Sequence, residues 1–393
     1  MLSNRFKDVV ESRISANGND TVKGCQDFAE TFIRELNVGD ANGKKINPRR
    51  VSLKSLAEAL INFQYDKPFS WDASPDRIRE ALNTTHFPWI TGELIHNVLV
   101  EGYQIWSIQV EPLVQEFDST AAQYEYFAGI RAARVPSRVH QGEPYQERSF
   151  DEKECRCELA KFGEIVNMTR ELILADQTNE IMAFAKNNGE KLGKILHRMV
   201  IQTITDTART DLGESTSTAL YYAGSAQTVY SSDHSAIDGQ TNDNSTTGVI
   251  NSTNLESAYT LMAGMKDEAG DEIMIDPTVC LCAPNIFPTA WKYFSTPLPY
   301  EPGSANLTPS FWKEGGGGRI IPIQSPYVTT SLWYLGNPKR QTRLYWGWRM
   351  ETSSQGGDSD AAFDRDVVAR FKSSIKFGLA LSDYRYMIYS TGS

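Results

Sequence analysis

The residues best suited to chemistry in this sequence are its cysteines, because two pairs of them have the spacing Cys-x-Cys. The pairs are Cys155 with Cys157 and Cys280 with Cys282, and Cys25 stands apart. Four thiolates could in principle bind zinc, but paired zinc ligands usually have about two to four residues between them. In a β-strand, residues i and i+2 simply share a face. We therefore expect buried thiols without a metal site, and an odd, sparse set predicts a reducing cytoplasm and no disulfide framework.

The histidines form no recognisable catalytic set; they are His86, His96, His140, His197 and His234. Asp233 beside His234 has the residue types needed for acid–base work, but no nucleophile with a positioning context stands nearby. His86 and His96 lie ten residues apart without a third ligand at metal spacing. The glycine run at 315–318 lacks the Lys and the Ser or Thr that a phosphate-binding loop needs. The sequence therefore predicts no catalytic site, no metal and no cofactor.

The composition is typical of a globular protein. The chain has 393 residues, enough for two or three domains, and 40% of them are hydrophobic. The net charge is −10, and Lys and Arg form no cluster of five or more. This balance argues against tight nucleic-acid binding, although a surface that encloses DNA without adhering to it would also be acidic or neutral. No apolar run reaches the length of a signal peptide or a membrane span, so we expect no membrane partner.

The longest predicted element is a helix over residues 176–206. Asp176 or Thr178 can cap its start. Asn188 and Gly189 are where it could kink or break, because glycine costs about 1 kcal/mol relative to alanine in a helix. On its length alone, such a helix favours the core of a large α/β enzyme. Its apolar residues recur three and four positions apart, as on one face of a helix; they are Ile181, Phe184, Ala185, Leu192, Ile195, Leu196, Met199, Val200 and Ile204.

Residues 135–175 are charged and extended, with short period-two patches such as Cys155, Cys157 and Leu159. A hairpin buried in its own core would show one clean apolar face, but both faces of this segment are polar. An exposed strand pair is an aggregation hazard unless something pairs with it or covers it. We therefore predict that the segment projects as a hairpin and forms a surface for a partner.

The remaining segments predict smaller elements. Two amphipathic helical patterns occupy residues 22–36 and 53–61. Residues 251–350 predict a compact α/β unit, with strand candidates at 319–323, 332–335 and 344–348. The last stretch predicts a pair of strands with Gly378 between them, which closes back onto an earlier domain.

From about residue 87 to the end, roughly three quarters of the chain, the order of these pieces resembles the major capsid proteins of tailed phages. Those proteins have the Hong Kong 97-type fold, and the Mu-like major head subunit family is the most similar. FPWITGELIHNVLVEGYQIW resembles the part before their extended loop, and KFGEIVNMTRELILADQTNEIMAF the end of that loop running into the spine helix. VYSSDHSA resembles a strand ending in Asp-His before a Gly- and Asn-rich loop. LESAYTLMAGMKDEAGDEIMIDPTVCLCAPNIFPTAW resembles part of the axial domain, and FKSSIKFGLALSDYRYMIYSTG the returning strand pair.

This resemblance implies an α+β fold with an N-terminal arm, an extended β-hairpin loop, a peripheral domain containing a long spine helix, and an axial domain. The corresponding ranges are 1–80 for an N-terminal helical arm or scaffold-like region, 81–134 for a helical segment leading into the loop, 135–178 for the extended loop, 179–250 for the peripheral domain with its spine helix, 251–350 for the axial domain, and 351–393 for C-terminal strands returning to the peripheral domain.

The resemblance also implies a function without enzymatic activity. Major capsid proteins self-assemble through pentamers and hexamers into an icosahedral shell that encloses double-stranded DNA, here in the cytoplasm of a bacterial host. Scaffold, portal and decoration proteins are further candidate partners. An encapsulin-like compartment that packages a cargo enzyme and a soluble α/β enzyme are the alternatives. Charged loop residues at the subunit interface would set register more than affinity; the candidates are Arg148, Glu152, Arg156, Glu158 and Lys161.

Overall fold

The computed structural model describes residues 21–39, 43, 45–48, 51–54, 56–57, 60, 86–130, 152–175, 178–209, 220–222, 225–227, 229–235, 241–267, 271–295, 320–355 and 367–392. Contacts divide the chain into two compact units. The first comprises Met1–Trp106, Lys161–Lys194 and Arg349–Ile375, and the second comprises Ser107–Ala160, Ile195–Trp348 and Lys376–Ser393.

Helices and strands are both well represented, as the α+β prediction requires. The helices are α2 (Thr21–Asn37), α5 (His86–Ser107), α6 (Arg170–Leu174), α7 (Thr178–Ile204), α8 (Ser252–Ala263), α9 (Phe287–Ser295) and α11 (Pro338–Gln341). The strands are β1 (Gln115–Asp118), β2 (Tyr124–Ile130), β3 (Glu152–Glu158), β4 (Ala160–Thr169), β5 (Leu220–Tyr222), β6 (Ser225–Gln227), β7 (His234–Ser235), β8 (Thr241–Asn242), β9 (Ser245–Thr246), β10 (Val279–Cys282), β11 (Ile321–Gln324), β12 (Trp333–Gly336), β13 (Thr342–Gln355), β14 (Val367–Leu381) and β15 (Met387–Ser390).

Within the described part of the first unit, α2, α5, α7 and β4 all contribute to a shared apolar core. Phe32 of α2 and Phe87 of α5 are completely or almost completely buried in it. The predicted helical pattern at residues 22–36 is thereby confirmed as α2. Thr178 at the first position of α7 accepts a hydrogen bond from the Leu53 main-chain nitrogen at 3.0 Å, which ties the segment around residue 53 to the start of that helix.

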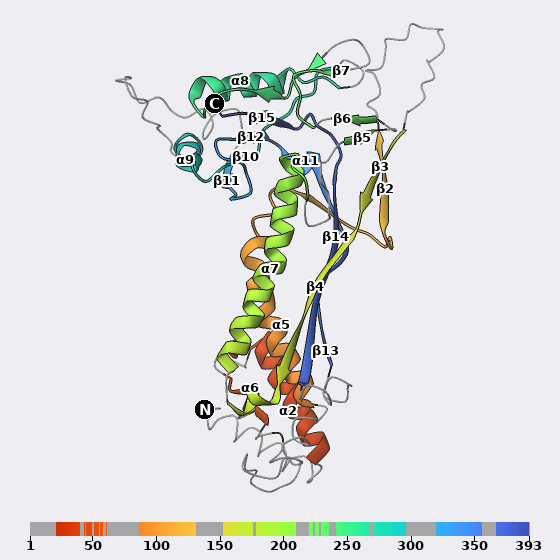
Figure 1. Ribbon diagram of the computed structural model, residues 1–393, viewed down its shortest axis with the longest axis vertical. Coiled ribbons are helices and arrows are strands. Elements are labelled where there is room, and N and C mark those ends of the chain that lie inside the picture. Colours follow the sequence, from red (N-terminus) through yellow and green to blue (C-terminus); the bar gives the residue numbers. More distant parts are fainter. Residues whose placement is uncertain are drawn as a thin grey trace. The chain divides into compact units, whose positions relative to one another are not determined.

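The predicted long helix is confirmed as α7, a single helix of 27 residues. It lies beside α5 (Figure 1) and does not break at Gly189. A Cβ at Gly189 would lie 2.9 Å from the Leu99 carbonyl carbon and 3.0 Å from the Tyr103 nitrogen. At Gly193, a Cβ would lie 2.7 Å from the Tyr103 carbonyl oxygen. The glycines therefore allow the backbones of the two helices to touch, which is a packing role rather than a helix-breaking one.

The core of the second unit surrounds a five-stranded sheet with the order β11-β10-β12-β15-β9. β10 pairs in parallel with β11 and antiparallel with β12. All four residues of β10 are buried, and α8 and α9 add Leu255, Ala258 and Ala290 to the same core. The strands predicted at 319–323 and 332–335 are confirmed as β11 and β12, each shifted by one or two residues.

A second sheet has the order β1-β13-β14-β4 and corrects the prediction for the end of the chain. β14 is one continuous strand of 15 residues, so the expected turn at Gly378 is wrong. A Cβ at Gly378 would lie 2.6 Å from the Glu158 carbonyl oxygen and 2.7 Å from Cys157 Sγ, so the glycine lets another strand approach. β15 pairs antiparallel with β12 and not with β14. The two C-terminal strands therefore belong to different sheets.

Candidate functional site

The charged candidates on β3 lie in a two-stranded antiparallel hairpin formed by β2 and β3. Tyr124 is opposite Glu158, Tyr126 is opposite Arg156, and Ile130 is opposite Glu152. Glu152, Arg156 and Glu158 thus occupy register positions separated by even numbers, which fall on one face of a strand. The first strand of the hairpin, β2, begins at residue 124, within the range 81–134 that was expected to be helical.

One face of this hairpin is fixed to the protein. Cys157 is buried and belongs to a small apolar cluster with Leu159 and Tyr345, against which Phe127 packs. The Arg343 guanidinium carbon lies 4.9 Å from the centre of the Phe127 ring, a cation–π distance. Burial raises the pKa of the Cys157 thiol to about 12, so this sulfur is a protonated packing group.

The alternate positions at the same end of the hairpin face solvent. Tyr126 is 56% exposed, and Glu158 is also exposed. Lys161, on β4, is exposed as well. Glu152, Arg156 and Glu158 are therefore spaced along a single strand, and Lys161 follows Glu158 by three residues along the chain. Arg148 lies outside the described residues.

The prediction missed the tyrosines of β2. Residues 123–127 read QYEYF, an alternation of aromatic and polar residues that is typical of a half-buried strand. That signal was available in the sequence, but the helical face of the preceding segment was extended across it. Tyr124 and Tyr126 add aromatic surface beside the charged positions of β3.

Buried thiols are confirmed for three of the cysteines. Cys157, Cys280 and Cys282 are free and buried. Cys280 and Cys282 lie in β10, and burial raises the pKa of both thiols above its ordinary value. Within the described ranges, no three His, Cys, Asp or Glu side chains gather closely enough to hold a metal ion. Cys-x-Cys therefore marks strand positions in this chain.

The described histidine side chains serve separate packing sites. His96 Nδ1 lies 3.0 Å from Thr352 Oγ1. His197 is completely buried, with Nε2 3.1 Å from Ser325 Oγ. Burial lowers the pKa of His197 to about 4, which keeps the ring neutral. Residue His140 and the glycine run at 315–318 lie outside the described residues.

Asp233 and His234 lie next to a polar cluster that joins distant segments of the second unit. His234 stacks on Tyr384 with ring centroids 3.8 Å apart, and its Nε2 lies 3.2 Å from Asn244 Oδ1. Asn244 Nδ2 donates to the carbonyl oxygens of Val229 and Tyr384. These hydrogen bonds connect the loops around Asn244 to one another. Burial lowers the pKa of His234.

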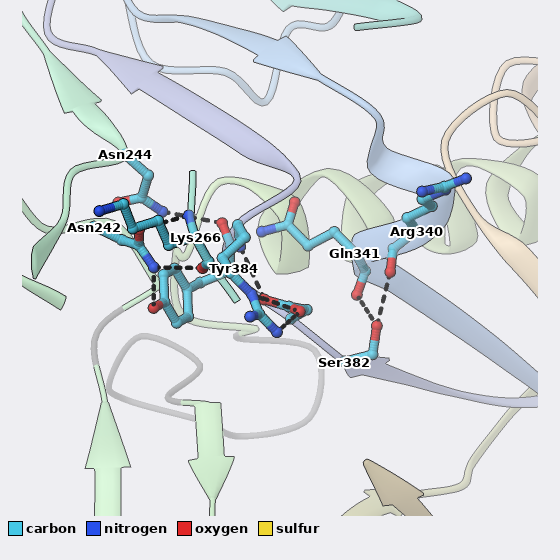
Figure 2. Close-up of polar contacts among 9 residues, drawn as sticks. Asn242, Asn244, Lys266, Arg340, Gln341, Ser382 and Tyr384 are labelled. Carbon is cyan, nitrogen blue, oxygen red and sulfur yellow. Dashed lines mark hydrogen bonds and ion pairs between the residues drawn. The ribbon is translucent and has the colours of Figure 1, made fainter. Parts of the chain in front are cut away.

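Figure 2 shows a second asparagine in the same cluster. Asn242 Nδ2 donates to the Lys266 carbonyl oxygen and Asn242 Oδ1 accepts from the Lys266 main-chain nitrogen, each at 2.9 Å. Nδ2 also lies 3.3 Å from the Tyr384 hydroxyl, to which it donates. Ser382 Oγ donates to the carbonyl oxygens of Arg340 and Gln341. The cluster fixes the chain between β14 and β15, and it positions loops without presenting a nucleophile. Among the described helices, none is both long enough and apolar enough to cross a membrane.

Comparisons with known proteins add a family match. A model of the phage capsid protein family matches residues 156–390. The capsid structure of cyanophage P-SCSP1u is similar at 11% identity and a TM-score of 0.47, covering 72% of this chain and 88% of that chain. A structure from Microbacterium phage Oxtober96 has 9% identity, a TM-score of 0.44 and coverage of 72% and 90%. A virus-like particle from Pyrococcus furiosus has 13% identity, a TM-score of 0.42 and coverage of 75% and 96%. No curated protein matches the chain.

Proposed function

Because the chain belongs to the phage capsid protein family, and is a major capsid protein of an icosahedral shell, we propose that pentamers and hexamers of this chain build that shell around double-stranded phage DNA. The family match over residues 156–390 is the observation that carries the proposal. The net charge of −10 is consistent with it, because an acidic or neutral wall does not hold the DNA backbone tightly. The place of the protein is the virion capsid.

The mechanism we infer is association, without a catalysed reaction and without a cofactor. Rings of identical subunits need heterologous contacts, in which one patch of a subunit meets a different patch of its neighbour. Each contact can be weak, because a closed shell makes many of them at once and so raises the overall stability.

The β2–β3 hairpin is the surface that we propose for one of these contacts. Its base is fixed by Cys157 and Phe127, so the hairpin is held in place before a neighbour arrives. Exposed Tyr126 can supply contact area, and Glu158 and its charged neighbours can set register. The candidate interface residues remain Arg148, Glu152, Arg156, Glu158 and Lys161.

The roles of the larger segments follow from the same family. We propose that residues 135–178, extended by β2, form the loop that reaches a neighbouring subunit. Residues 179–250 would form the peripheral domain with α7 as its spine helix, and residues 251–350 the axial domain around the capsomer axis. Residues 351–393 would contribute strands to the peripheral domain, and residues 1–80 an arm or a scaffold-like region.

Further partners are part of the proposal. A scaffold, a portal and decoration proteins would act on the shell during or after its assembly in the cytoplasm of the bacterial host. None of these roles requires this chain to bind DNA sequence-specifically.

The contents of the particle test the proposed cargo. Particles containing this chain would be isolated from the cells that produce them, treated with nuclease and then opened. We expect double-stranded DNA protected from the nuclease. An enzyme in place of DNA would show that the shell is an encapsulin-like compartment and would overturn the DNA part of the proposal, while leaving the shell itself intact.

A further inference from the structure

The C-terminal end of α7 carries a carboxyl group in an unusual setting. Asp206 follows the last helical residue, Ile204, by two positions and has a backbone φ of 53°. This left-handed conformation is uncommon outside glycine, although aspartate and asparagine tolerate it better than most residues. Its Oδ1 is buried and has no hydrogen-bond partner within the described part of the chain.

Three tyrosines lie against this helix end. The rings of Tyr230, Tyr334 and Tyr389 contact one another pairwise, with centroids 5.3 to 5.5 Å apart. The Tyr230 hydroxyl donates to the Ile204 carbonyl oxygen at 2.6 Å, a group that the helix itself leaves without an intrahelical partner. Since Tyr334 belongs to β12 and Tyr389 to β15, this cluster fastens the end of α7 to the five-stranded sheet.

Among the residues that the structure describes, no basic side chain contributes to the pKa of Asp206. The titratable groups that face it are the hydroxyls of Tyr230 and Tyr334, and their pKa values are raised by burial and further by the nearby Asp206 carboxylate. Gln202 on α7 and Gln341 on α11 carry uncharged amides. The next basic residue along the chain, Arg209, donates to the Leu379 carbonyl oxygen at 3.1 Å.

A negative charge is unfavourable at this buried position. Burial raises the pKa of Asp206 from 3.8 to about 6, although a hydrogen bond from the Val229 main chain opposes the shift. The negative end of the α7 dipole also disfavours a carboxylate there. In the folded protein, Asp206 therefore changes its charge close to neutral pH.

We propose that protonation of Asp206 controls how stably the end of α7 is attached to the five-stranded sheet. The attachment is stable when Asp206 is protonated, and it is weakened when Asp206 ionises beside the tyrosine cluster. The folded state binds this proton more tightly than the unfolded state does. The stabilisation is therefore fully present below about pH 4 and is lost as the pH rises through about 6. The device acts within one subunit, so it does not depend on what the shell contains.

Amide hydrogen exchange of the full chain, measured between about pH 4 and pH 7 and corrected for intrinsic exchange rates, tests this attachment of α7. We expect the protection of residues 201–209 and 229–235 to fall as the pH rises, by up to about tenfold for each unit of pH between the two pKa values. Asp206→Asn keeps the shape and tolerates the positive φ, so its protection should stay high and constant. Asp233→Asn, an exposed site in the second segment, should keep the parental pH dependence.

Two results would overturn the proposal. One is protection in the unsubstituted chain that stays constant across this pH range at an unchanged assembly state. The other is a folded Asp206→Asn variant that loses protection with pH as the parent does. The first result decides the matter even if the variant does not fold.

Discussion

Gly189 of α7 lies so close to Leu99 of α5 that a Cβ added to the glycine would be 2.9 Å from the Leu99 carbonyl carbon. Gly102 meets α7 in the same way, because its Cβ would lie 3.1 Å from the Glu190 nitrogen. Helices α5 and α7 are thus in backbone contact, and side chains at these positions would push them apart.

Gly189→Ala should destabilise the protein by about 1–3 kcal/mol, the usual cost of overpacking, despite a helix-propensity gain of about 1 kcal/mol. Denaturant unfolding of the full chain measures this change. Gly264→Ala is the matched control, because its Cβ would meet nothing nearer than the Thr260 oxygen at 3.5 Å. A Gly189→Ala variant as stable as the parent would show that the helices can separate at little cost.

Tyr126→Ala and Glu158→Lys should leave the chain folded but raise the concentration needed for assembly. Both side chains are exposed, so they contribute little to the fold, whereas each change would be repeated at every copy of the interface. Sedimentation of parent and variants at a series of concentrations measures the effect. Glu111→Lys, at an exposed turn outside the hairpin, is the control. Normal assembly by both hairpin variants would remove the hairpin from the interface.

His197 should make the fold sensitive to acid. Its pKa falls from 6.5 to about 4 on folding, so the unfolded chain binds this proton first, and stability is lost as the pH drops from about 6.5 towards 4. A loss on the order of 2–3 kcal/mol follows from the size of that shift. Unfolding curves at about pH 7 and pH 4.5 should show a smaller loss for His197→Gln than for the parent.

His96→Gln is the comparison for this experiment, since His96 is only partly buried beside Thr352. It should keep the parental acid sensitivity. An equal pH dependence in His197→Gln and the parent would mean that other groups cause the acid response. The stabilisation that Asp206 contributes has the opposite pH dependence, because it decreases as the pH rises. The two contributions can therefore be separated.

Cys280 and Cys282 should resist alkylation in the folded protein. Both thiols are completely buried in β10, and burial raises their pKa values, which disfavours the reactive thiolate. Mass spectrometry after brief treatment with a maleimide should find these two residues modified only in denaturant. Rapid labelling under native conditions would show that the sheet opens far more readily than its packing indicates.

Local sequence patterns predicted much of the fold. The three- and four-residue spacing from Ile181 to Ile204 specified α7 because it reflects contacts within one helix. Gly189 and Gly378 were misinterpreted for one reason: each makes room for a distant strand or helix, and local propensity contains no information about that neighbour. The place of β15 between β12 and β9 is equally non-local.

The candidate site was predictable to a similar extent. The period-two pattern that includes Cys155 and Cys157 predicted an extended segment, and β3 confirms it. Glu152, Arg156 and Glu158 lie on this strand, and their place at an interface stays a prediction. Their partner strand was missed because the helical pattern ending near Trp106 was carried too far. Asp206 gave no signal at all, since its raised pKa comes from burial, and the residues near it, such as Tyr230 and Tyr334, belong to other segments.

Electron microscopy of particles assembled from the full chain tests the central claim most directly. The account predicts closed shells of uniform size with icosahedral symmetry, in which the density resolves pentamers and hexamers of this chain. A discrete monomer or dimer at high concentration, without rings or shells at any salt concentration and with or without a scaffold protein, would contradict it.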